Sequence, residues 1–213
     1  MFRISSVYFD FMQFLTSGFR VKNFHFRHDS SDVVNMNSIN KQQEEENRKN
    51  LTGTEAAEKI KELAEKATSC FFCTDLKSGK PFATRPMSVQ QVDEQGNVWF
   101  LMAADSHTVM QLGSDPTVQL LFQGSHHSDF LSIYGKASVS TDKEKIKNFW
   151  SPLLKTWFTE GENDPRIRVV KTVPEQGYYW DTKHGGMVAF AKQLIGAAIG
   201  KTMDDSIEGK LIV

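Results

Sequence analysis

Two pairs of side chains have the chemistry to bind a metal or act as nucleophiles: Cys70 with Cys73, and His126 with His127. The cysteines lie three residues apart in the apolar run SCFFCTD, and residues three apart on a strand point to opposite faces. The two thiols therefore cannot easily reach one metal or each other, and we interpret them as core residues of a cytoplasmic protein. Adjacent histidines on an extended chain also point apart, so we expect no metal site.

The usual catalytic constellations do not stand out. The sequence has no Ser-His-Asp order, no glycine-rich phosphate loop and no glycosidase-like pair of carboxylates. Its charge is nearly balanced, with 25 Lys and Arg against 26 Asp and Glu, which excludes an extended basic surface for nucleic acid. We therefore expect a small molecule or another protein as the partner.

The stretch TWFTEGENDP, residues 156–165, places two large aromatic rings directly before a polar turn. Aromatic side chains contribute most when they are buried, whereas the composition of residues 160–165 is typical of an exposed turn. Trp157 and Phe158 must therefore be sheltered by something beside this turn.

The elements that position these residues follow from hydrophobic periodicity. The capping-box spacing TGTE (52–55) and one apolar face predict a helix over about residues 53–67, with exposed pairs Glu55–Lys59 and Glu62–Lys66. Strands are predicted over 69–75, 80–92, 97–104, 117–125 and 130–140, with RIRVVKTV (166–173) and GYYWD (177–181) as two more, separated by Pro174 and Glu175. Short helices are predicted at 106–113 and from Asp142 to about Ser151, and MVAFAKQLIGAAIG (187–200) predicts a packed amphipathic helix before the terminal KLIV. Antiparallel hairpins at this spacing predict an α+β fold, a small antiparallel barrel with helices at its rim.

The first 50 residues do not join this pattern. Seven of the 16 phenylalanines lie between Phe2 and Phe26, in a segment too short and too charged to span a bilayer. Three interpretations compete for residues 1–35: an upstream region before a true start at Met36, a peripheral membrane-binding tail, or a mitochondrion-like targeting segment. We favour the first and expect residues 1–50 to be an extension, disordered or upstream of Met36, with the domain at 51–213 and no membrane as partner.

Five segments are informative through their order and spacing: RPM (85–87), VWFLMAADS (98–106), VQLLF (118–122), SIYGKASV (132–139) and FWSPLLKTWFTEGENDPRIRVVKTVPEQGYYWD (149–181). Over roughly residues 53–213 the chain resembles the general stress protein 26 branch of the pyridoxamine 5'-phosphate oxidase-like split barrels. The resemblance implies an antiparallel split β-barrel with peripheral helices. It also implies a homodimer that binds FMN at two sites across the subunit interface, near Trp157, whose ring would be buried on dimerisation.

By the same resemblance, Arg85 is expected to bind the FMN phosphate or face the ring, with Pro86 and Met87 on the same strand. The side chains and backbone of Phe100, Leu101 and Met102 are expected to line the ring. The turn that follows is expected to contact the phosphate through Ser106 and Thr108, and Gln123 to hydrogen-bond to the ring or to the partner chain.

The sequence departs from the family pattern at Ser106-His107-Thr108, because many relatives have lysine at the position of Thr108. Loss of one charge-assisted hydrogen bond costs about 1.5 to 3 kcal/mol, or roughly tenfold to a hundredfold in FMN affinity, unless His107 or a nearby lysine compensates. A hydroxyl and a helix N-terminus still favour a phosphate at this position.

These observations support an FMN-binding, oxidoreductase-like protein of the general stress type, acting by flavin hydride chemistry on an unknown small molecule. The alternative is a stress protein that binds or stores flavin without catalysis, and a third possibility is a deazaflavin or haem in the same barrel. The chain does not end in the arginine- and histidine-containing extension that clamps the substrate phosphate in true vitamin oxidases, so we expect poor pyridoxine phosphate oxidase activity.

Overall fold

The computed structural model describes residues 47–78, 81–126, 128–185, 191–192, 195 and 205–213. Most of the predicted extension (1–46) and most of the predicted helix over 187–200 lie outside these residues. The described residues belong to one compact unit.

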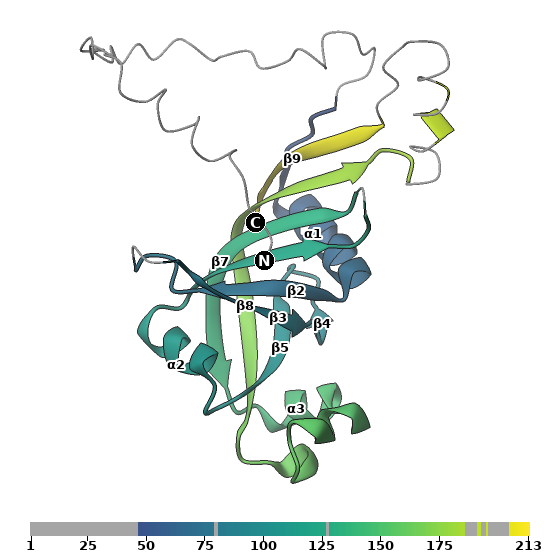
Figure 1. Ribbon diagram of the computed structural model, residues 1–213. Coiled ribbons are helices and arrows are strands. Elements are labelled where there is room, and N and C mark those ends of the chain that lie inside the picture. Colours follow the sequence, from purple (N-terminus) through teal and green to yellow (C-terminus); the bar gives the residue numbers. More distant parts are fainter. Residues whose placement is uncertain (1–46, 79–80, 127, 186–190, 193–194, 196–204) are drawn as a thin grey trace, which may run out of the picture. The chain divides into compact units, whose positions relative to one another are not determined.

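This unit is an α+β structure in which three α-helices accompany a nine-stranded sheet, counted over the described residues (Figure 1). The helices are α1 (Gly53–Ala67), α2 (His107–Ser114) and α3 (Lys143–Phe149), and two short 3-10 helices, η3 (Pro152–Thr156) and η4 (Gly161–Asn163), follow α3. The strands are β1 (Leu51–Thr52), β2 (Ser69–Thr74), β3 (Ala83–Ser88), β4 (Gln91–Val92), β5 (Val98–Ala103), β6 (Thr117–Gln123), β7 (Phe130–Ser140), β8 (Ile167–Thr182) and β9 (Ser206–Ile212). All strand pairs are antiparallel except β1 with β9.

The long strand β8 joins the two parts of this sheet. One edge of β8 pairs with β7 over almost its whole length. Its other edge pairs with β5 through residues 167–172 and with β9 through residues 176–182. The main path runs β1-β9-β8-β7-β6-β2-β3, whereas β5 pairs only with β4 and β8 among the described strands. The sheet is therefore not closed, because no ladder joins β3 to β5 in the described residues.

The bend in β8 occurs where the two predicted strands were expected to separate. Pro174 faces Gly135 and Gln176 faces Tyr134, so Glu175 is an extra residue at a register shift. The prediction of two strands there was wrong: Pro174 and Glu175 form a bulge within one strand, which bends the strand without ending it. The predicted strand over 80–92 is likewise divided into β3 and β4.

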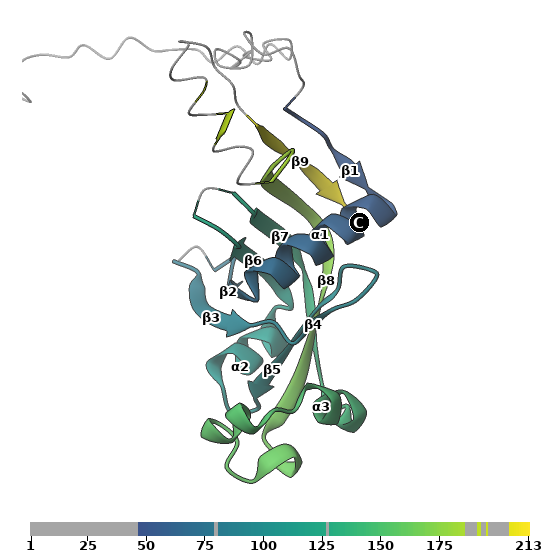
Figure 2. The same ribbon diagram turned by 90° about the vertical axis from the view of Figure 1, so that its right-hand side faces the viewer.

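Helix α1 covers one face of the sheet (Figures 1 and 2) and begins at Gly53 as predicted. It buries Ile60 and Leu63 against the sheet, but the Thr52 side chain makes no capping hydrogen bond, so the predicted capping box does not form. The predicted pairs Glu55–Lys59 and Glu62–Lys66 do not form: Lys59 instead pairs with Glu62, and both lysines contact buried carboxylates outside the helix. Lys59 Nζ lies 2.7 Å from Asp181 Oδ2, and Lys66 pairs with Asp129 at the β6–β7 turn.

The N-terminal end of the described chain also belongs to the sheet. The Lys49 backbone N–H donates to Glu208 O at 2.9 Å, and Tyr179 Oη donates to Lys49 O at 2.8 Å. Pairing with β9 therefore begins before residue 51, the expected start of the domain. No helix among the described residues combines the length and the apolar character needed to cross a membrane.

We predict that Gly135→Ala destabilises the protein, because a Cβ at this position would overlap the carbonyl oxygen of Val173 at the bulge. Overpacking of this kind costs typically about 1 to 3 kcal/mol in the free energy of unfolding. Urea unfolding followed by circular dichroism measures it.

Gly113→Ala is the matched control, since a Cβ there would have no neighbour within 4 Å and alanine favours the helix. Equal free energies of unfolding for the two variants would contradict the prediction, because they would show that the β7–β8 bulge accommodates an added methyl group without cost.

Candidate functional site

A cavity of about 350 Å³ lies at the opening between β3 and β5, and we call it the split pocket. Its walls come from both strands, from the start of α2 and from η3 with the two residues that follow it. The volume falls within the range of small-molecule sites. The lining residues are Arg85, Pro86, Met87, Ser88, Gln90, Leu101, Met102, Ala103, Ser106, Thr108, Leu154, Trp157 and Phe158.

One end of the split pocket is cationic. The half-buried Arg85 guanidinium donates to Thr74 Oγ1 at 2.9 Å and to Gln111 Oε1 at 3.1 Å, and Thr74 donates to the same Gln111 oxygen at 2.7 Å. These partners are neutral, and no carboxylate of the described chain forms an ion pair with Arg85. Burial without a counter-ion lowers the pKa of Arg85. An anionic ligand would supply the missing charge.

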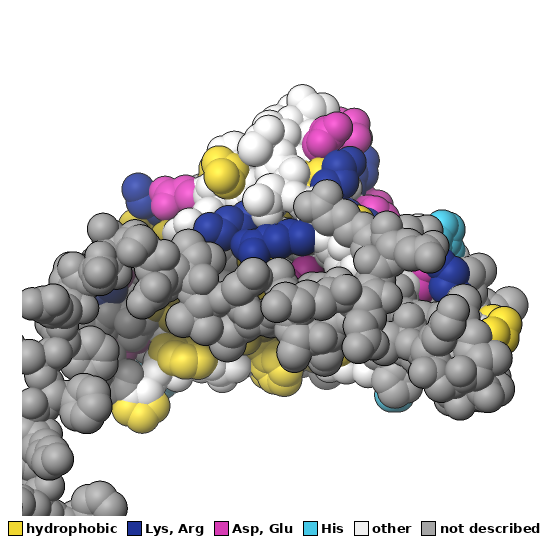
Figure 3. Space-filling model, turned by 90° about the horizontal axis from the view of Figure 1, so that it is seen from above, with side chains coloured by type: hydrophobic (Ala, Val, Ile, Leu, Met, Phe, Trp, Pro, Cys, Tyr) yellow, Lys and Arg dark blue, Asp and Glu magenta, His cyan; other side chains and the backbone are white. Residues whose placement is uncertain are grey.

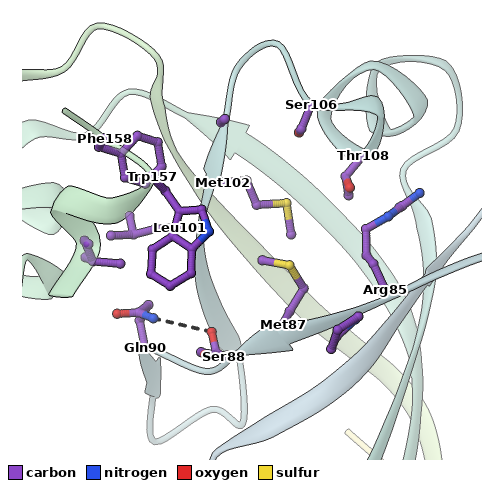
Figure 4. Close-up of a pocket in the computed structure, with 13 residues that line it drawn as sticks. Arg85, Met87, Ser88, Gln90, Leu101, Met102, Ser106, Thr108, Trp157 and Phe158 are labelled. Carbon is purple, nitrogen blue, oxygen red and sulfur yellow. Dashed lines mark hydrogen bonds between the residues drawn. The ribbon is translucent and has the colours of Figure 1, made fainter. Parts of the chain in front are cut away.

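The first turn of α2 borders the same end. Ser106 is the N-cap, and its Oγ accepts a hydrogen bond from the Val109 N–H at 3.3 Å. Thr108 is buried and lines the pocket, and Figure 4 shows Arg85 pointing toward it from β3. Helix N-termini favour anions through free N–H groups and the helix dipole. A guanidinium, a hydroxyl and a helix N-terminus therefore converge on one end of the cavity.

Methionines and uncharged polar groups occupy the middle. Met87 follows Arg85 by two residues on β3 and so faces the same side, and Figure 4 shows its side chain directed toward Met102 of β5. Flexible thioethers adapt to flat or irregular ligands. Ser88 and Gln90 continue the β3 wall, and Gln90 Nε2 donates to Ser88 O at 3.4 Å.

The far end is aromatic and apolar. Trp157 is 65% exposed, whereas Phe158 is buried in a cluster with Leu101 and Ile146. Phe158 is therefore sheltered by its own chain, while most of the Trp157 ring remains uncovered. Of the two aromatic residues before the polar turn, only Trp157 needs a further partner.

The Asp164–Arg166 ion pair of this turn is hydrogen-bonded to the backbone of Trp157. Arg166 donates to Asp164 Oδ2 at 2.7 Å and to Trp157 O at 3.3 Å. Asp164 is 1% exposed, and its hydrogen bond with Arg166 lowers the pKa of the carboxyl to about 2. Asp164, which belongs to a turn that is polar in sequence, is therefore buried and positions Arg166 against the backbone of Trp157.

The split pocket contains eight of the residues expected from the sequence: Arg85, Pro86, Met87, Leu101, Met102, Ser106, Thr108 and Trp157. Phe100 is not among its lining residues, because its side chain is fully buried in the core against Phe72, with ring centroids 5.2 Å apart. His107 is exposed and lies outside the lining. Gln123 lies at the end of β6, beside a different cavity.

The sequence interpretation omitted five lining residues: Ser88, Gln90, Ala103, Leu154 and Phe158. Four consecutive residues, 85–88, line the pocket, so alternation along β3 does not single out Ser88, and Gln90 lies beyond the end of β3. Nothing in the local sequence indicates that η3 meets the split between β3 and β5, because this contact depends on how the chain returns after α3.

A second cavity, of about 390 Å³, opens on the sheet face opposite α1. Phe71, Pro86, Leu121, Phe130 and Trp180 share this face by strand register, and we call them the apolar sheet face. Phe71 is 54%, Leu121 38% and Trp180 42% exposed. Hydrophobic side chains also stand out along one edge of the described surface in Figure 3. Large apolar side chains that are exposed side by side are typical of a binding or subunit interface.

The arrangement of the split pocket fits a flat ligand with an anionic tail. The cation without a carboxylate partner and the buried Thr108 hydroxyl suit a phosphate, and the methionines with Leu101 suit an apolar ring. FMN has both parts. In the described residues no three side chains of His, Cys, Asp or Glu gather as a metal site would require.

The chain is similar in sequence to a known protein family and to one curated protein. The family model for proteins described as "Pyridoxamine 5'-phosphate oxidase like" matches residues 55–205. The protein bli-3 of Neurospora crassa is 27% identical over 135 residues, which cover 57% of this chain and 64% of that protein. The match therefore spans just under two thirds of this curated relative.

Two solved structures share the fold. One, described as a general stress protein 26 of Jannaschia sp. CCS1, has a TM-score of 0.63 at 23% identity and covers 73% of this chain and 97% of its own. The general stress protein 26 of Bacillus anthracis str. Sterne has a TM-score of 0.50 at 20% identity, over 58% and 92% of the two chains. The predicted split β-barrel with peripheral helices is confirmed.

We predict that Asp164→Asn lowers the free energy of unfolding at pH 7 and that the difference from the unchanged protein shrinks as the pH falls. The pKa of Asp164 is about 2 in the folded protein and lies below its ordinary value of 3.8. Its contribution is therefore complete above about pH 4 and is lost as the pH falls through 2. Urea midpoints measured between pH 7 and pH 2 test this.

Glu162→Gln is the control, because Glu162 is an exposed carboxylate of the same turn. If both variants show the same midpoints at every pH, the Asp164–Arg166 pair does not hold the turn.

Proposed function

Because the chain belongs to the pyridoxamine 5'-phosphate oxidase-like family, we propose that its split pocket binds FMN and that the protein is a flavin-dependent oxidoreductase acting on a small molecule. The main support is the half-buried Arg85 guanidinium, which has only neutral partners at one end of a cavity whose described lining is otherwise uncharged. Desolvating an unpaired cation is unfavourable, and a bound phosphate compensates for it.

At the cationic end, Arg85 binds the phosphate and is held in position by Thr74 and Gln111. The Thr108 hydroxyl and the N-terminus of α2 add neutral donors. His107 is exposed outside the lining and does not replace the lysine of related proteins. Phosphate binding therefore depends mainly on one guanidinium.

Toward the other end, Met87, Leu101 and Met102 provide an apolar surface for a ring, and Trp157 extends over an open side. When bound, FMN supplies hydride transfer. The chain's own residues orient the ring and exclude water, and no general acid or base is required among them for a hydride to move.

A non-catalytic flavin-binding or flavin-storing stress protein is the second candidate. The observation in its favour is that Arg85 is the only charged side chain in the described lining of the split pocket. Reduction of bound FMN by NADH or NADPH, followed by its reoxidation by an electron acceptor over many cycles, would indicate an oxidoreductase. A storage protein would not show this turnover.

We further propose that the protein is a homodimer formed through the apolar sheet face. This face spans β2, β3, β6, β7 and β8, and Pro86 lines both its cavity and the split pocket. A partner on this face would lie next to FMN and would cover apolar surface that the single chain exposes. Gln123 lines the cavity on this face and would hydrogen-bond to the partner chain. The buried free thiols Cys70 and Cys73 suit a cytoplasmic location.

We predict that Arg85→Ala weakens FMN binding by about tenfold to a hundredfold, the value of one charge-assisted hydrogen-bonding group. Riboflavin, which lacks the phosphate, should bind both forms equally. Quenching of flavin fluorescence measures both affinities.

Lys155→Ala is the control, since Lys155 is an exposed cation of η3 beside the pocket but outside its lining. An equal loss of FMN and riboflavin affinity in Arg85→Ala would contradict a phosphate-binding role. No binding of FMN by the unchanged protein would overturn the proposed function.

For the homodimer, we predict that Phe71→Lys yields a monomer of 24.2 kDa, because it places a charge at the centre of the apolar sheet face. FMN affinity should fall with it. Light scattering after size exclusion measures the mass, and Met110→Lys, at an exposed methionine of α2, is the control. A Phe71→Lys protein that remains dimeric would exclude this face as the interface.

A further inference from the structure

The distribution of charge in the split pocket restricts what it can bind beside FMN. In the lining that the structure describes, Arg85 is the only charged side chain. One guanidinium can neutralise one anionic group. If Arg85 binds the flavin phosphate, as proposed above, no cation of this lining remains for a charged group on a second ligand.

Arg85 is also held away from the opposite end. Its two terminal nitrogens donate to Thr74, which is fully buried, and to Gln111 of α2. Figure 4 shows the guanidinium on the side of Thr108, with Met87 and Met102 lying between it and Trp157. Moving it toward Trp157 would break both hydrogen bonds, so the charge is confined to one end.

The opposite end combines an aromatic surface with neutral polar groups. Trp157 provides a largely exposed indole, and Leu154 adds apolar surface beside it. The Gln90 side-chain amide makes only a long bond to Ser88 O, at 3.4 Å, so it can exchange this bond for one to a ligand oxygen. These groups suit a planar, uncharged ligand that bears a carbonyl or hydroxyl.

The apolar sheet face does not supply the missing charge. The described lining of its cavity consists of apolar residues with Ser69 and Gln123 as the polar members, and none is charged. A second copy that covers the split pocket with this face would enclose it without adding a cation or a carboxylate.

We infer that, beside FMN, the split pocket takes an uncharged planar molecule with a hydrogen-bonding oxygen, of the quinone class, and excludes phosphorylated or sulfonated ligands. This inference rests on the proposed function, because it assigns Arg85 to the flavin phosphate. Gln90 is the residue that contacts the polar atom of this ligand, and Trp157 the residue that contacts its ring.

The test compares two ligands that differ in charge, 2-methyl-1,4-naphthoquinone and 1,4-naphthoquinone-2-sulfonate. Equilibrium dialysis against the full chain loaded with FMN measures the binding of each without relying on turnover. We expect the uncharged quinone to bind at least about tenfold more tightly, because an unpaired anion is costly to bury beside Trp157 and Leu154.

The variant Gln90→Lys introduces a cation at the neutral end and should reverse this preference in favour of the sulfonate. Gln95→Lys is the matched control, since Gln95 is exposed in the β4–β5 turn and outside the lining, and should keep the original preference. A reversal restricted to Gln90→Lys would place the second ligand beside residue 90.

The possible failures are distinguishable because FMN binding is measured first. If FMN binds but the unchanged protein takes the sulfonate as tightly as the quinone, or takes neither, the inference is overturned and the proposed function stands. If Gln90→Lys keeps the original preference, the second ligand does not lie at this end and the inference fails. If FMN does not bind, both the proposed function and the inference are overturned.

Discussion

Each edge of a strand can hydrogen-bond to only one neighbour at a given residue, and β8 meets this limit by dividing one edge between two strands. Residues 167–172 pair with β5 and residues 176–182 with β9, with the bulge at Pro174 and Glu175 between them. The sheet therefore branches, and β5 departs from β3 instead of pairing with it. The split pocket occupies this opening, so its position follows from hydrogen bonding along β8 and from the close approach of Gly135 to Val173.

The opening between β3 and β5 also separates the cationic end of the pocket from its aromatic end. β3 brings Arg85 to the start of α2, where neutral partners hold its guanidinium. β5 brings Leu101 to η3, where the turn braced by Asp164 and Arg166 holds Trp157. The fixed cation at one end suits an anionic group, and the aromatic surface at the other suits an uncharged ring.

Most elements could be predicted because their signals are local. Apolar residues at helical spacing located α1, and short apolar runs bounded by turns located β2, β5, β6 and β7. Predictions failed where a distant contact prevailed. Lys59 pairs with buried Asp181 as well as with Glu62 of its own helix, Lys66 pairs with buried Asp129, and pairing with β7 keeps β8 continuous through Pro174. The burial of Phe100 against Phe72 could not be foreseen either, since both faces of β5 are apolar in sequence.

By itself the sequence determined the α+β class, the positions of most strands along the chain and the family, because periodicity, turn residues and motif spacing are properties of neighbouring residues. It also brought forward eight residues that line one cavity. Only the tertiary structure decided that Arg85 has neutral partners, that Phe158 is buried while Trp157 is exposed, and that Gln90 and Leu154 join the same cavity. These outcomes depend on contacts between segments far apart in the chain, and they exist only once β8 has placed β5, β7 and β9 around it.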